Sequence, residues 1–344
     1  MQPVVDLRSD TVTQPTERMR EAMAAARVGD DVFREDPTVA ELEQLAARMV
    51  GHRAGLFCSS GTMANLVAVL AHCQRGDAVF ADTDAHVLHY EAGGLAVLAG
   101  TFPQPIRTAD GNPTPEELEA AVPPPDVHRP HPRLVWLENT HNRAGGVAYP
   151  PERTAAVAWW AHARGLRVHL DGARLFNAAV ALGVPAADLA SPADSVMVSL
   201  SKGLSAPVGS VLCGSEEFIE HARRWRKVVG GGMRQVGVLA AAGLVALREM
   251  VDRLAEDHRR ARALAEGLAQ VPGVAVDTHR VHTNIVLARV ADAAAVVEHL
   301  RAHGVLALAL DPHTIRFVTH RHVDDEGVER AVRAMREAVV SARR

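Results

Sequence analysis

The sequence contains 37 basic side chains, yet lysine occurs at only two positions, Lys202 and Lys227. Arginine stays protonated in proteins, whereas the amine of a lysine can lose its proton and become a nucleophile. Because arginine serves as the basic residue everywhere else, each retained lysine is a candidate for chemistry that needs a neutral amine. Codon bias is the alternative explanation, and the composition by itself does not separate the two.

Lys202 follows the strand-like run 194–200, and Asp171 ends the strand-like run 166–171. Their separation along the chain is typical of one strand–helix–strand crossover, which would bring both residues to one edge of a parallel sheet. Ligands of open α/β sheets bind beyond that carboxyl edge. An acid in this position can also simply cap the next helix, so Asp171 alone does not decide the matter.

A glycine turn formed by Ser60, Gly61 and Thr62 lies between a short apolar run and a helical pattern. Its N–H groups and hydroxyls are suited to a phosphate at the helix N-terminus, although such turns are also common without a ligand. Pyridoxal 5'-phosphate requires a lysine for its Schiff base, an acid at its pyridine nitrogen and a phosphate-binding turn. The combination with Lys202 and Asp171 therefore predicts a site for this cofactor. No Walker motif is present, and the glycines at 230–232 lack the dinucleotide-binding spacing.

The 18 histidines raise the alternative of a metal site. Pairs at 86/89, 128/131, 279/282 and 320/322 have metal-like spacing, but none forms an HExxH motif or a zinc pattern with cysteine. We therefore expect hydrogen-bonded or solvated histidines and predict no metal. His141 differs, because it follows the strand-like run 133–138 at the edge predicted for Asp171. An imidazole there can stack on a ring or move a proton.

Lys227 lies in the segment HARRWRKVVGGGMRQ, beside Arg223, Arg224 and Arg226. One interpretation is a solvated basic face of a helix. The other is an anion contact, either within the chain or across a subunit interface. The pattern is compatible with both.

The elements that must position these residues alternate between strands and helices. Strands are predicted at 77–82, 133–138, 166–171, 194–200 and 208–214, and helices at 37–50, 114–122 and 152–164. The alternation predicts an α/β fold with a doubly wound, mostly parallel sheet that is covered on both faces. A long helical stretch over 234–270 then leads to strands at 284–290, 305–309 and 314–320. We therefore predict a large α/β domain of residues 1–246 and a smaller C-terminal α+β domain of residues 247–344.

The composition excludes several classes of protein. The net charge of -4 provides no basic surface for nucleic acid. The longest apolar run, 236–247, is too short to span a bilayer, and no signal peptide is visible at the N-terminus. Three scattered cysteines, Cys58, Cys73 and Cys213, are typical of a reducing compartment. We expect a cytoplasmic protein without nucleic-acid or membrane partners.

Segments distributed over nearly the whole chain carry a family resemblance. They are DLRSDTVTQP (6–15), GDDVFREDPTV (29–39), SSGTMAN (59–65), HVLHYEAGG (86–94), ENTHNRAGG (138–146), HLDGARLFNA (169–178), SLSKGLSAPVGSVL (199–212), GGGMRQ (230–235) and IRFVTH (315–320). Together they make the sequence similar to the low-specificity L-threonine aldolases. These are pyridoxal-phosphate enzymes of fold type I, the fold of aspartate aminotransferase.

The resemblance implies how the cofactor is held. Lys202 matches the Schiff-base lysine, and Asp171 matches the partner of the pyridine nitrogen. The phosphate would be held by Ser60, Gly61 and Thr62, with help from Arg234 and from Lys227, which would reach the phosphate of a neighbouring subunit.

The resemblance also implies how the substrate is held. His86 would stack on the cofactor ring, and His141 would lie near the ring and the substrate hydroxyl. The substrate carboxylate would be bound by Ser9, Arg174 and Arg316. Ser205 departs from the pattern, because glycine commonly follows SKGL, and we expect no loss of activity from this change.

The implied reaction is retro-aldol cleavage of L-threonine, L-allo-threonine and related β-hydroxy-α-amino acids to glycine and an aldehyde. His86 and His141 are both candidate bases for the β-hydroxyl, directly or through water. The family also implies a homotetramer built from dimers, with active sites at subunit interfaces. The alternatives are a transaminase or β-eliminating lyase on the same fold, a non-catalytic scaffold and a metal-dependent hydrolase. The preference between threonine and allo-threonine does not follow from the sequence.

Overall fold

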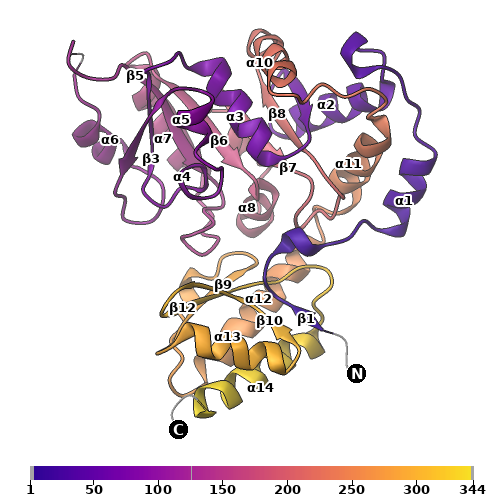
Figure 1. The fold of residues 1–344 in the computed structure, drawn as a ribbon, viewed down its shortest axis with the longest axis vertical. Coiled ribbons are helices and arrows are strands. Elements are labelled where there is room, and N and C mark those ends of the chain that lie inside the picture. Colours follow the sequence, from indigo (N-terminus) through magenta and orange to yellow (C-terminus); the bar gives the residue numbers. More distant parts are fainter. Residues whose placement is uncertain (1–3, 125, 342–344) are drawn as a thin grey trace.

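A seven-stranded sheet forms the centre of the larger of two units (Figure 1). The computed structural model describes residues 4–124 and 126–341 and orders the strands β2-β8-β7-β6-β5-β3-β4. The bounds are Ala54–Cys58 (β2), Ala78–Asp82 (β3), Phe102–Ile106 (β4), Pro132–Glu138 (β5), Arg167–Gly172 (β6), Ser195–Ser199 (β7) and Ser210–Gly214 (β8). Neighbouring strands are parallel except where β8 pairs with β2 and β7. The predicted α/β fold with a mostly parallel sheet is confirmed.

Two strands depart from the simple alternating pattern. β8 follows β7 through a loop over 200–209 that contains no helix, so the chain returns antiparallel instead of crossing over. β4 has the sequence FPQPI, in which two prolines remove backbone donors. It lies at the edge of the sheet, where a strand tolerates missing donors on its outer side.

Helices bury both faces of the sheet. Alternate residues of β5 belong to different cores, with Val135 and Leu137 in one and Leu134 and Trp136 in another. This division follows from the two-residue period of a strand and confirms that the sheet is doubly wound. The helices of this unit are Glu17–Ala24 (α1), Pro37–Met49 (α2), Gly61–His72 (α3), His86–His89 (α4), Gly94–Val97 (α5), Pro115–Ala121 (α6), Pro151–His162 (α7), Leu175–Leu182 (α8), Ala186–Ala190 (α9), Glu216–Val228 (α10) and Gly237–Glu249 (α11).

The smaller unit contains both ends of the described chain (Figure 1). Its strands are Ile285–Arg289 (β9), Val305–Leu306 (β10), Leu308–Asp311 (β11) and Thr314–Val318 (β12), and its helices are Leu254–Ala269 (α12), Ala293–Ala302 (α13) and Asp325–Ser341 (α14). An antiparallel sheet with the order β11-β12-β9 packs with these helices around one core.

The structure differs from the predicted domain division at the N-terminus. β1 (Val5–Asp6) pairs with β10, and Leu7 lies in the core of the small unit, although the division placed residues 1–246 in the large one. Residue 246 lies within α11, which packs against α1 and α2. The helical stretch predicted over 234–270 is divided into α11 and α12. Leu254 of α12 belongs to the large core and Leu264 to the small one, so α12 connects the units.

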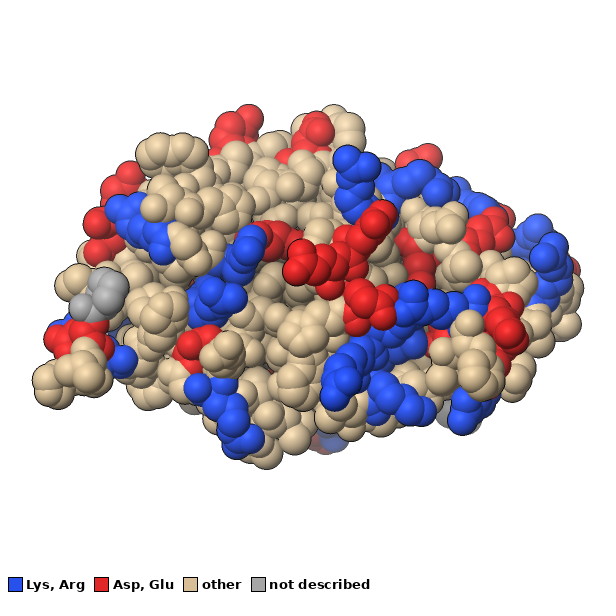
Figure 2. All heavy atoms as spheres, turned by 90° about the horizontal axis from the view of Figure 1, so that it is seen from above, with Lys and Arg blue, Asp and Glu red and all other residues tan. Residues whose placement is uncertain are grey.

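The charged side chains of both signs are distributed over the face of the molecule seen from above (Figure 2). Within residues 4–124 and 126–341, no helix has the length and apolar character needed to cross a membrane.

Candidate active site

The register of the sheet brings the predicted site residues to one edge. Cys58 of β2, Ser210 of β8 and Ser199 of β7 lie side by side in the last row of the sheet. The glycine turn 59–62 and Lys202 both follow directly from this row. Asp171 pairs with Met197 and Glu138, only slightly further from the edge. The ligand-binding edge of an α/β sheet therefore contains the turn, the lysine and the acid together.

The glycine turn forms the N-terminus of α3. Ser60 caps this helix, because its Oγ accepts a hydrogen bond from the Met63 N–H at 3.1 Å. The helix dipole and the free N–H groups of the first turn suit an anion such as phosphate. The side chain of Met63 also lies against Gly231, which brings the loop 230–232 next to this turn.

The two basic residues expected to assist the phosphate lie on the surface of this chain. Arg234 is 60% exposed and pairs with Asp30 at 3.1 Å. Lys227 is exposed on α10, and its side chain lies along Gly232. Their neighbour Arg226 is instead buried and paired with Asp31, so the basic segment of α10 is not a uniformly solvated face.

Lys202 is half-buried, and its backbone is held in place on both sides. Its carbonyl accepts hydrogen bonds from Thr13 Oγ1 at 2.8 Å and from the Ser205 N–H at 2.9 Å. Burial lowers the pKa of Lys202, and the nearby charge of Arg174 lowers it further. The site therefore favours the neutral amine that a nucleophilic lysine needs.

Ser205 occupies the position where the sequence departs from its family. Its φ is 67°, in the left-handed region, and its side chain is buried. Glycine adopts this conformation at the least cost, which explains why it suits this turn. Ser205 thus adopts a backbone conformation that suits glycine, although the residue is not glycine.

Asp171 is 1% exposed, and both of its oxygens accept hydrogen bonds. Oδ1 accepts from the Ala173 N–H at 3.0 Å, and Oδ2 accepts from Asn65 Nδ2 at 2.8 Å. Burial and the charge of Glu138 raise the pKa of Asp171, against the opposing effects of His86, Lys202 and Asn65. A cationic group next to Asp171 would lower its pKa and stabilise the ionised carboxylate. The protonated pyridine nitrogen of pyridoxal phosphate is such a group.

His86 begins α4 and has one nitrogen available. Its Nδ1 lies 2.9 Å from Glu91 Oε1, so the neutral ring donates from Nδ1 and keeps a lone pair on Nε2. Its side chain is 28% exposed. Burial would lower the pKa of His86, but the hydrogen bond to Glu91 and the charges of Asp171 and Glu138 raise it overall.

His141 is enclosed on all sides. Its Nδ1 accepts a hydrogen bond from the Ala144 N–H at 3.1 Å, which places the proton of the neutral ring on Nε2. That nitrogen faces Asp82 Oδ1 at 3.4 Å, and the side chain is fully buried. Burial would lower the pKa of His141, whereas Glu138 and Asp82 raise it overall.

The two arginines predicted for the substrate carboxylate lie together. Asn142 Oδ1 accepts from Arg316 Nη1 at 3.0 Å and from Arg174 Nη1 at 3.4 Å. Arg174 forms a two-pronged pair with Asp10, at 2.7 and 2.8 Å. Arg316 pairs with no carboxylate among the described residues, and its buried Nε lacks a hydrogen-bond partner there. Burial and the charge of Arg174 lower the pKa of Arg316, so the pair is short of one anion.

Ser9 lies in the same N-terminal segment as Asp10. It caps the short 3-10 helix Asp10–Val12, and its Oγ accepts from the Thr11 N–H at 3.2 Å. Because that oxygen acts here as an acceptor, the hydroxyl proton remains available for a carboxylate.

Several residues of this site were not identified from the sequence. They are Asp10, Asn65, Glu91, Glu138 and Asn142. Each lies within a segment of the family resemblance, which was the available signal. Their roles depend on contacts between distant segments, and spacing along the chain does not reveal these.

The donor set fits pyridoxal phosphate. A lysine with a depressed pKa, a buried acid and a helix N-terminus meet at one edge of the sheet, next to two arginines of which only Arg174 has a carboxylate partner among the described residues. These are the groups that such a cofactor and an amino-acid substrate require.

Comparison with known proteins gives the same result. The beta-eliminating lyase family model matches residues 6–293. Low-specificity L-threonine aldolase 1 of Arabidopsis thaliana is 44% identical over 98% of this chain and 97% of its own length. The low specificity L-threonine aldolase of Escherichia coli (strain K12) is 45% identical over 94% of this chain and 96% of its own. The threonine aldolase structure of Leishmania major shares the fold, with a TM-score of 0.84 and 20% identity over 97% of this chain and 99% of that one.

Near-complete coverage at this level of identity includes every segment that builds the site. A pyridoxal-phosphate enzyme of fold type I is also what the sheet edge, the lysine and the acid describe. The chain therefore belongs to the low-specificity L-threonine aldolases of the beta-eliminating lyase family.

Proposed function

We propose that this protein cleaves L-threonine, L-allo-threonine and related β-hydroxy-α-amino acids to glycine and an aldehyde by a retro-aldol reaction. The observation that carries the proposal is a half-buried lysine with a lowered pKa near two adjacent arginines, Arg174 and Arg316, that have one carboxylate, Asp10, between them within the described part of the chain. A compact amino-acid substrate supplies a second carboxylate, while its amine approaches the lysine.

The residues at the sheet edge would hold the cofactor. Lys202 would attach it, the N-terminus of α3 at Ser60, Gly61 and Thr62 would hold its phosphate, and Asp171 would lie at its pyridine nitrogen. When bound, pyridoxal phosphate withdraws the electrons released at the α-carbon of an amino acid. Arg234 and Lys227 are proposed to assist the phosphate, and the loop 230–232 beside Met63 supports this placement.

The substrate carboxylate would be bound by Arg316, Arg174 and Ser9. Planar guanidinium groups hold a carboxylate in a fixed orientation, which also fixes the rotation about the bond to the α-carbon. Asp10 occupies two donors of Arg174 already, so Arg174 is the more firmly positioned group. Arg316 has more N–H groups that are still free to donate to a substrate carboxylate.

We propose His86 as the group that accepts the β-hydroxyl proton. Its Nε2 has a free lone pair, because Glu91 holds the proton on Nδ1. His141 is a positioning residue in this proposal, since its Nδ1 is taken by the Ala144 N–H and its ring is fully buried. The geometry thus favours one of the two candidate bases.

The central test replaces Lys202. The Lys202→Ala protein should lose the visible absorption band of the bound cofactor and its production of glycine and acetaldehyde from L-threonine. Both products are measured, because ammonia or a keto acid would instead indicate β-elimination or transamination. A Lys202→Ala protein with full glycine production would overturn the proposal.

A panel of L-threonine, L-allo-threonine, D-threonine and phenylserine defines the stereochemical preference.

We further propose an oligomer, a tetramer built from dimers, in the cytoplasm. Exposed apolar side chains that would suit subunit contacts include Phe33, Val97 and Trp159, each more than 70% exposed. The three cysteines are free in the structure, which supports a reducing compartment.

A further inference from the structure

A chain of buried hydrogen bonds runs along one face of the sheet, beneath α3, and ends at Asp171. It begins at His72 on α3, whose Nε2 lies 2.8 Å from Ser195 Oγ. Ser195 Oγ lies 2.8 Å from His169 Nδ1. His169 Nε2 lies 3.2 Å from Asn65 Oδ1, and Asn65 Nδ2 donates to Asp171 at 2.8 Å. None of these five side chains is more than 8% exposed.

The carboxylates of Asp171 and Glu91, at one end of this series of hydrogen bonds, fix the donor and the acceptor of every bond in the series. Asn65 Nδ2 contacts two carboxylates, Asp171 and Glu91, so it uses both protons there and leaves Oδ1 as an acceptor. His169 must therefore donate from Nε2. Burial holds the pKa of His169 well below its ordinary value, so the ring is neutral and its Nδ1 accepts.

The direction continues to the outer end. Because His169 Nδ1 accepts, the Ser195 hydroxyl donates to it and accepts in turn from His72 Nε2. Every donor in the chain thus points toward Asp171. Aligned hydrogen bonds polarise one another in a medium of low dielectric constant, which strengthens the last bond to the carboxylate.

The electrostatic surroundings of Asp171 explain why such support matters. Glu138 lies beside it in the sheet and Glu91 shares Asn65 with it, and both disfavour a further negative charge. His86 and Lys202 are the cationic groups that oppose them. If Asp171 lost its charge, the pyridine nitrogen would lose the anion that keeps it protonated.

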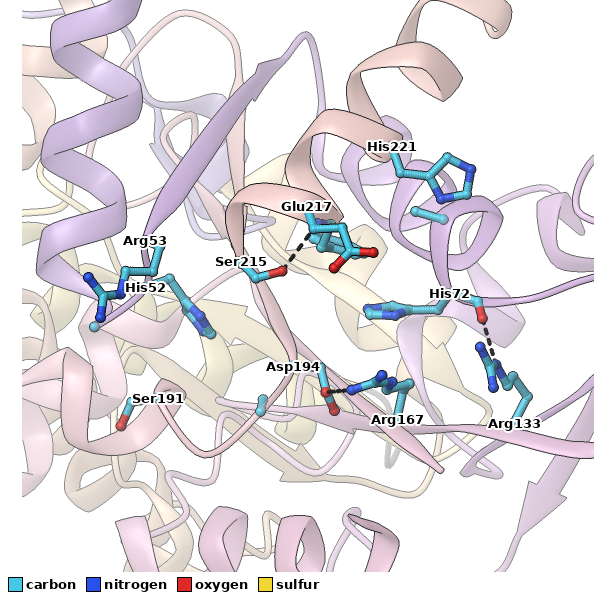
Figure 3. A pocket seen from close by; sticks show the side chains of 15 residues that line it. His52, Arg53, His72, Arg133, Arg167, Ser191, Asp194, Ser215, Glu217 and His221 are labelled. Carbon is cyan, nitrogen blue, oxygen red and sulfur yellow. Dashed lines mark hydrogen bonds and ion pairs between the residues drawn. The ribbon is translucent and has the colours of Figure 1, made fainter. Parts of the chain in front are cut away.

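The outer end of the chain lies in a pocket at the opposite edge of the sheet (Figure 3). This pocket, of about 540 Å³, is lined by His72, Ser191 and Asp194, among others. Asp194 directly precedes β7, which places the pocket at the amino end of the strand whose carboxyl end leads to Lys202. His72 stacks on Phe218 with ring centres 4.3 Å apart, so its orientation is fixed there.

We infer that Asn65, His169, Ser195 and His72 are positioning residues that keep Asp171 ionised and thereby keep the ring nitrogen of the bound cofactor protonated. This inference rests on the proposed function only in assigning Asp171 to the cofactor ring. It extends the set of residues that support the reaction along the face of the sheet beneath α3, to side chains that would touch neither the cofactor nor the substrate.

Ser195→Ala tests the inference, because it removes one hydroxyl between the two histidines. The protein is loaded with pyridoxal phosphate labelled with ¹⁵N in the ring, and the nitrogen shift is followed against pH. We expect the shift at neutral pH to move toward that of the unprotonated ring. We also expect kcat to fall about tenfold with KM within about twofold, as for the loss of one strong hydrogen bond. Ser195→Thr keeps the hydroxyl and should restore both quantities.

Ser191→Ala is the matched control, since it makes the same change in the same pocket outside the chain of bonds. It should leave the ring-nitrogen shift unchanged. His72→Phe provides a second variant if Ser195→Ala fails to fold, because it keeps an aromatic ring against Phe218 and removes the first donor. It should move the shift in the same direction by a smaller amount.

An unchanged nitrogen shift in Ser195→Ala or in the folded His72→Phe protein overturns the inference, even if activity falls. The result does not depend on the reaction catalysed. If the wild-type protein made no glycine but Ser195→Ala still moved the shift, the proposed reaction would be wrong and the positioning chain would stand.

Discussion

Hydrogen-bond partners at single atoms separate the two histidines that the sequence leaves equivalent. Glu91 leaves His86 Nε2 with a free lone pair, whereas the Ala144 N–H occupies the only acceptor of neutral His141. The side chain of His141 is also fully buried, whereas that of His86 is 28% exposed. A general base must have a free lone pair within reach of the proton it removes, and of the two histidines His86 has the free lone pair.

The pH dependence of the reaction should report His86. Its pKa is raised overall, and the base must be neutral, so kcat/KM should fall as the pH decreases through a value above 6.5. His86→Asn should lose this acidic limb and reduce kcat by about 100-fold or more, the usual contribution of a general base. A pH–rate profile on L-threonine measures both effects. If the His86→Asn protein kept the same acidic limb, a group other than His86 would be the general base.

Asp10 should make a pH-dependent contribution to stability. Burial would raise its pKa, but Arg174 and hydrogen bonds lower it from 3.8 to about 2. Its contribution of about 2 kcal/mol is therefore present above the unfolded pKa and is lost as the pH falls from about 4 toward about 2.

Asp10→Asn leaves Arg174 buried without an anion and should lower the free energy of unfolding by about 3 kcal/mol at neutral pH. Urea unfolding of both proteins between about pH 6 and about pH 2 should show the difference narrowing below about pH 4, as Asp10 is protonated first in the unfolded wild-type chain and then in the folded one. A difference that stays constant across this range would contradict the assignment. Asp6→Asn, which removes an acid from the exposed pair with Arg8, is the control and should have a smaller effect.

At the scale of elements, the loop between β7 and β8 is what places Lys202. It spans 200–209 and contains a turn closed by the Ser205 N–H and the Lys202 carbonyl. Asn177 of α8, together with Leu254 of α12, lies against Gly203 in the same turn, where an added Cβ would be 2.7 Å from Leu254. The lysine is thus fixed by backbone geometry and by packing from helices on two sides.

Ser205→Gly should stabilise the protein slightly. The left-handed φ of 67° costs a non-glycine residue roughly 1–2 kcal/mol, and glycine removes this cost. Glycine also raises the conformational entropy of the unfolded chain, which offsets part of the stabilisation. We expect a net rise of about 0.5 kcal/mol in the free energy of unfolding, with kcat unchanged. Ser205→Val, with a branched side chain at the same φ, should be destabilised. A Ser205→Gly protein less stable than wild type would show that the Ser205 hydroxyl matters more than the backbone.

At the scale of the whole molecule, the site is assembled from both units. Lys202, Asp171 and Arg174 come from the large unit, whereas Arg316 lies on β12 of the small one. Asn142 joins them, because its Oδ1 accepts from arginines of both units. The chain start, through β1 and Asp10, ties the same two units together.

A test of the proposed subunit interface uses two variants, one expected to be inactive and one expected to have reduced activity. Lys202→Ala removes the attachment point, and Lys227→Met should weaken phosphate binding at a neighbouring site. If Lys227 acts across an interface, hybrid oligomers contain some sites with both native lysines, and co-expression should restore part of the activity. Co-expression of Lys202→Ala with Asp171→Ala is the control. Both of these residues are supplied to a site by the same subunit, so every site in a hybrid oligomer still lacks one of them. This pair should therefore not restore activity. Sedimentation of the wild-type protein gives the oligomeric state independently.

The sequence by itself determined the fold class and most of the strands and helices, because the apolar periodicity and the glycine and proline positions act locally. It missed β4, whose prolines argue against a strand until the edge position is known, and it placed the chain start in the wrong unit, because the pairing of β1 with β10 joins residues 300 positions apart. Lys202, Asp171, His141 and the glycine turn 60–62 were identified by strand ends, spacing and turn composition, and the remaining predicted site residues by family resemblance.

Only the tertiary structure decided how these residues act on one another. It showed that His86 keeps a free acceptor nitrogen and His141 does not, that Arg316 lacks a carboxylate partner among the described residues, and which side chains contact Asp171 along one face of the sheet. These properties depend on burial and on contacts such as Asn65 with Asp171, which are set by packing between elements. Two lysines were exceptional in the sequence, but the protonation of one of them is a property of the folded surroundings, because burial and Arg174 lower its pKa.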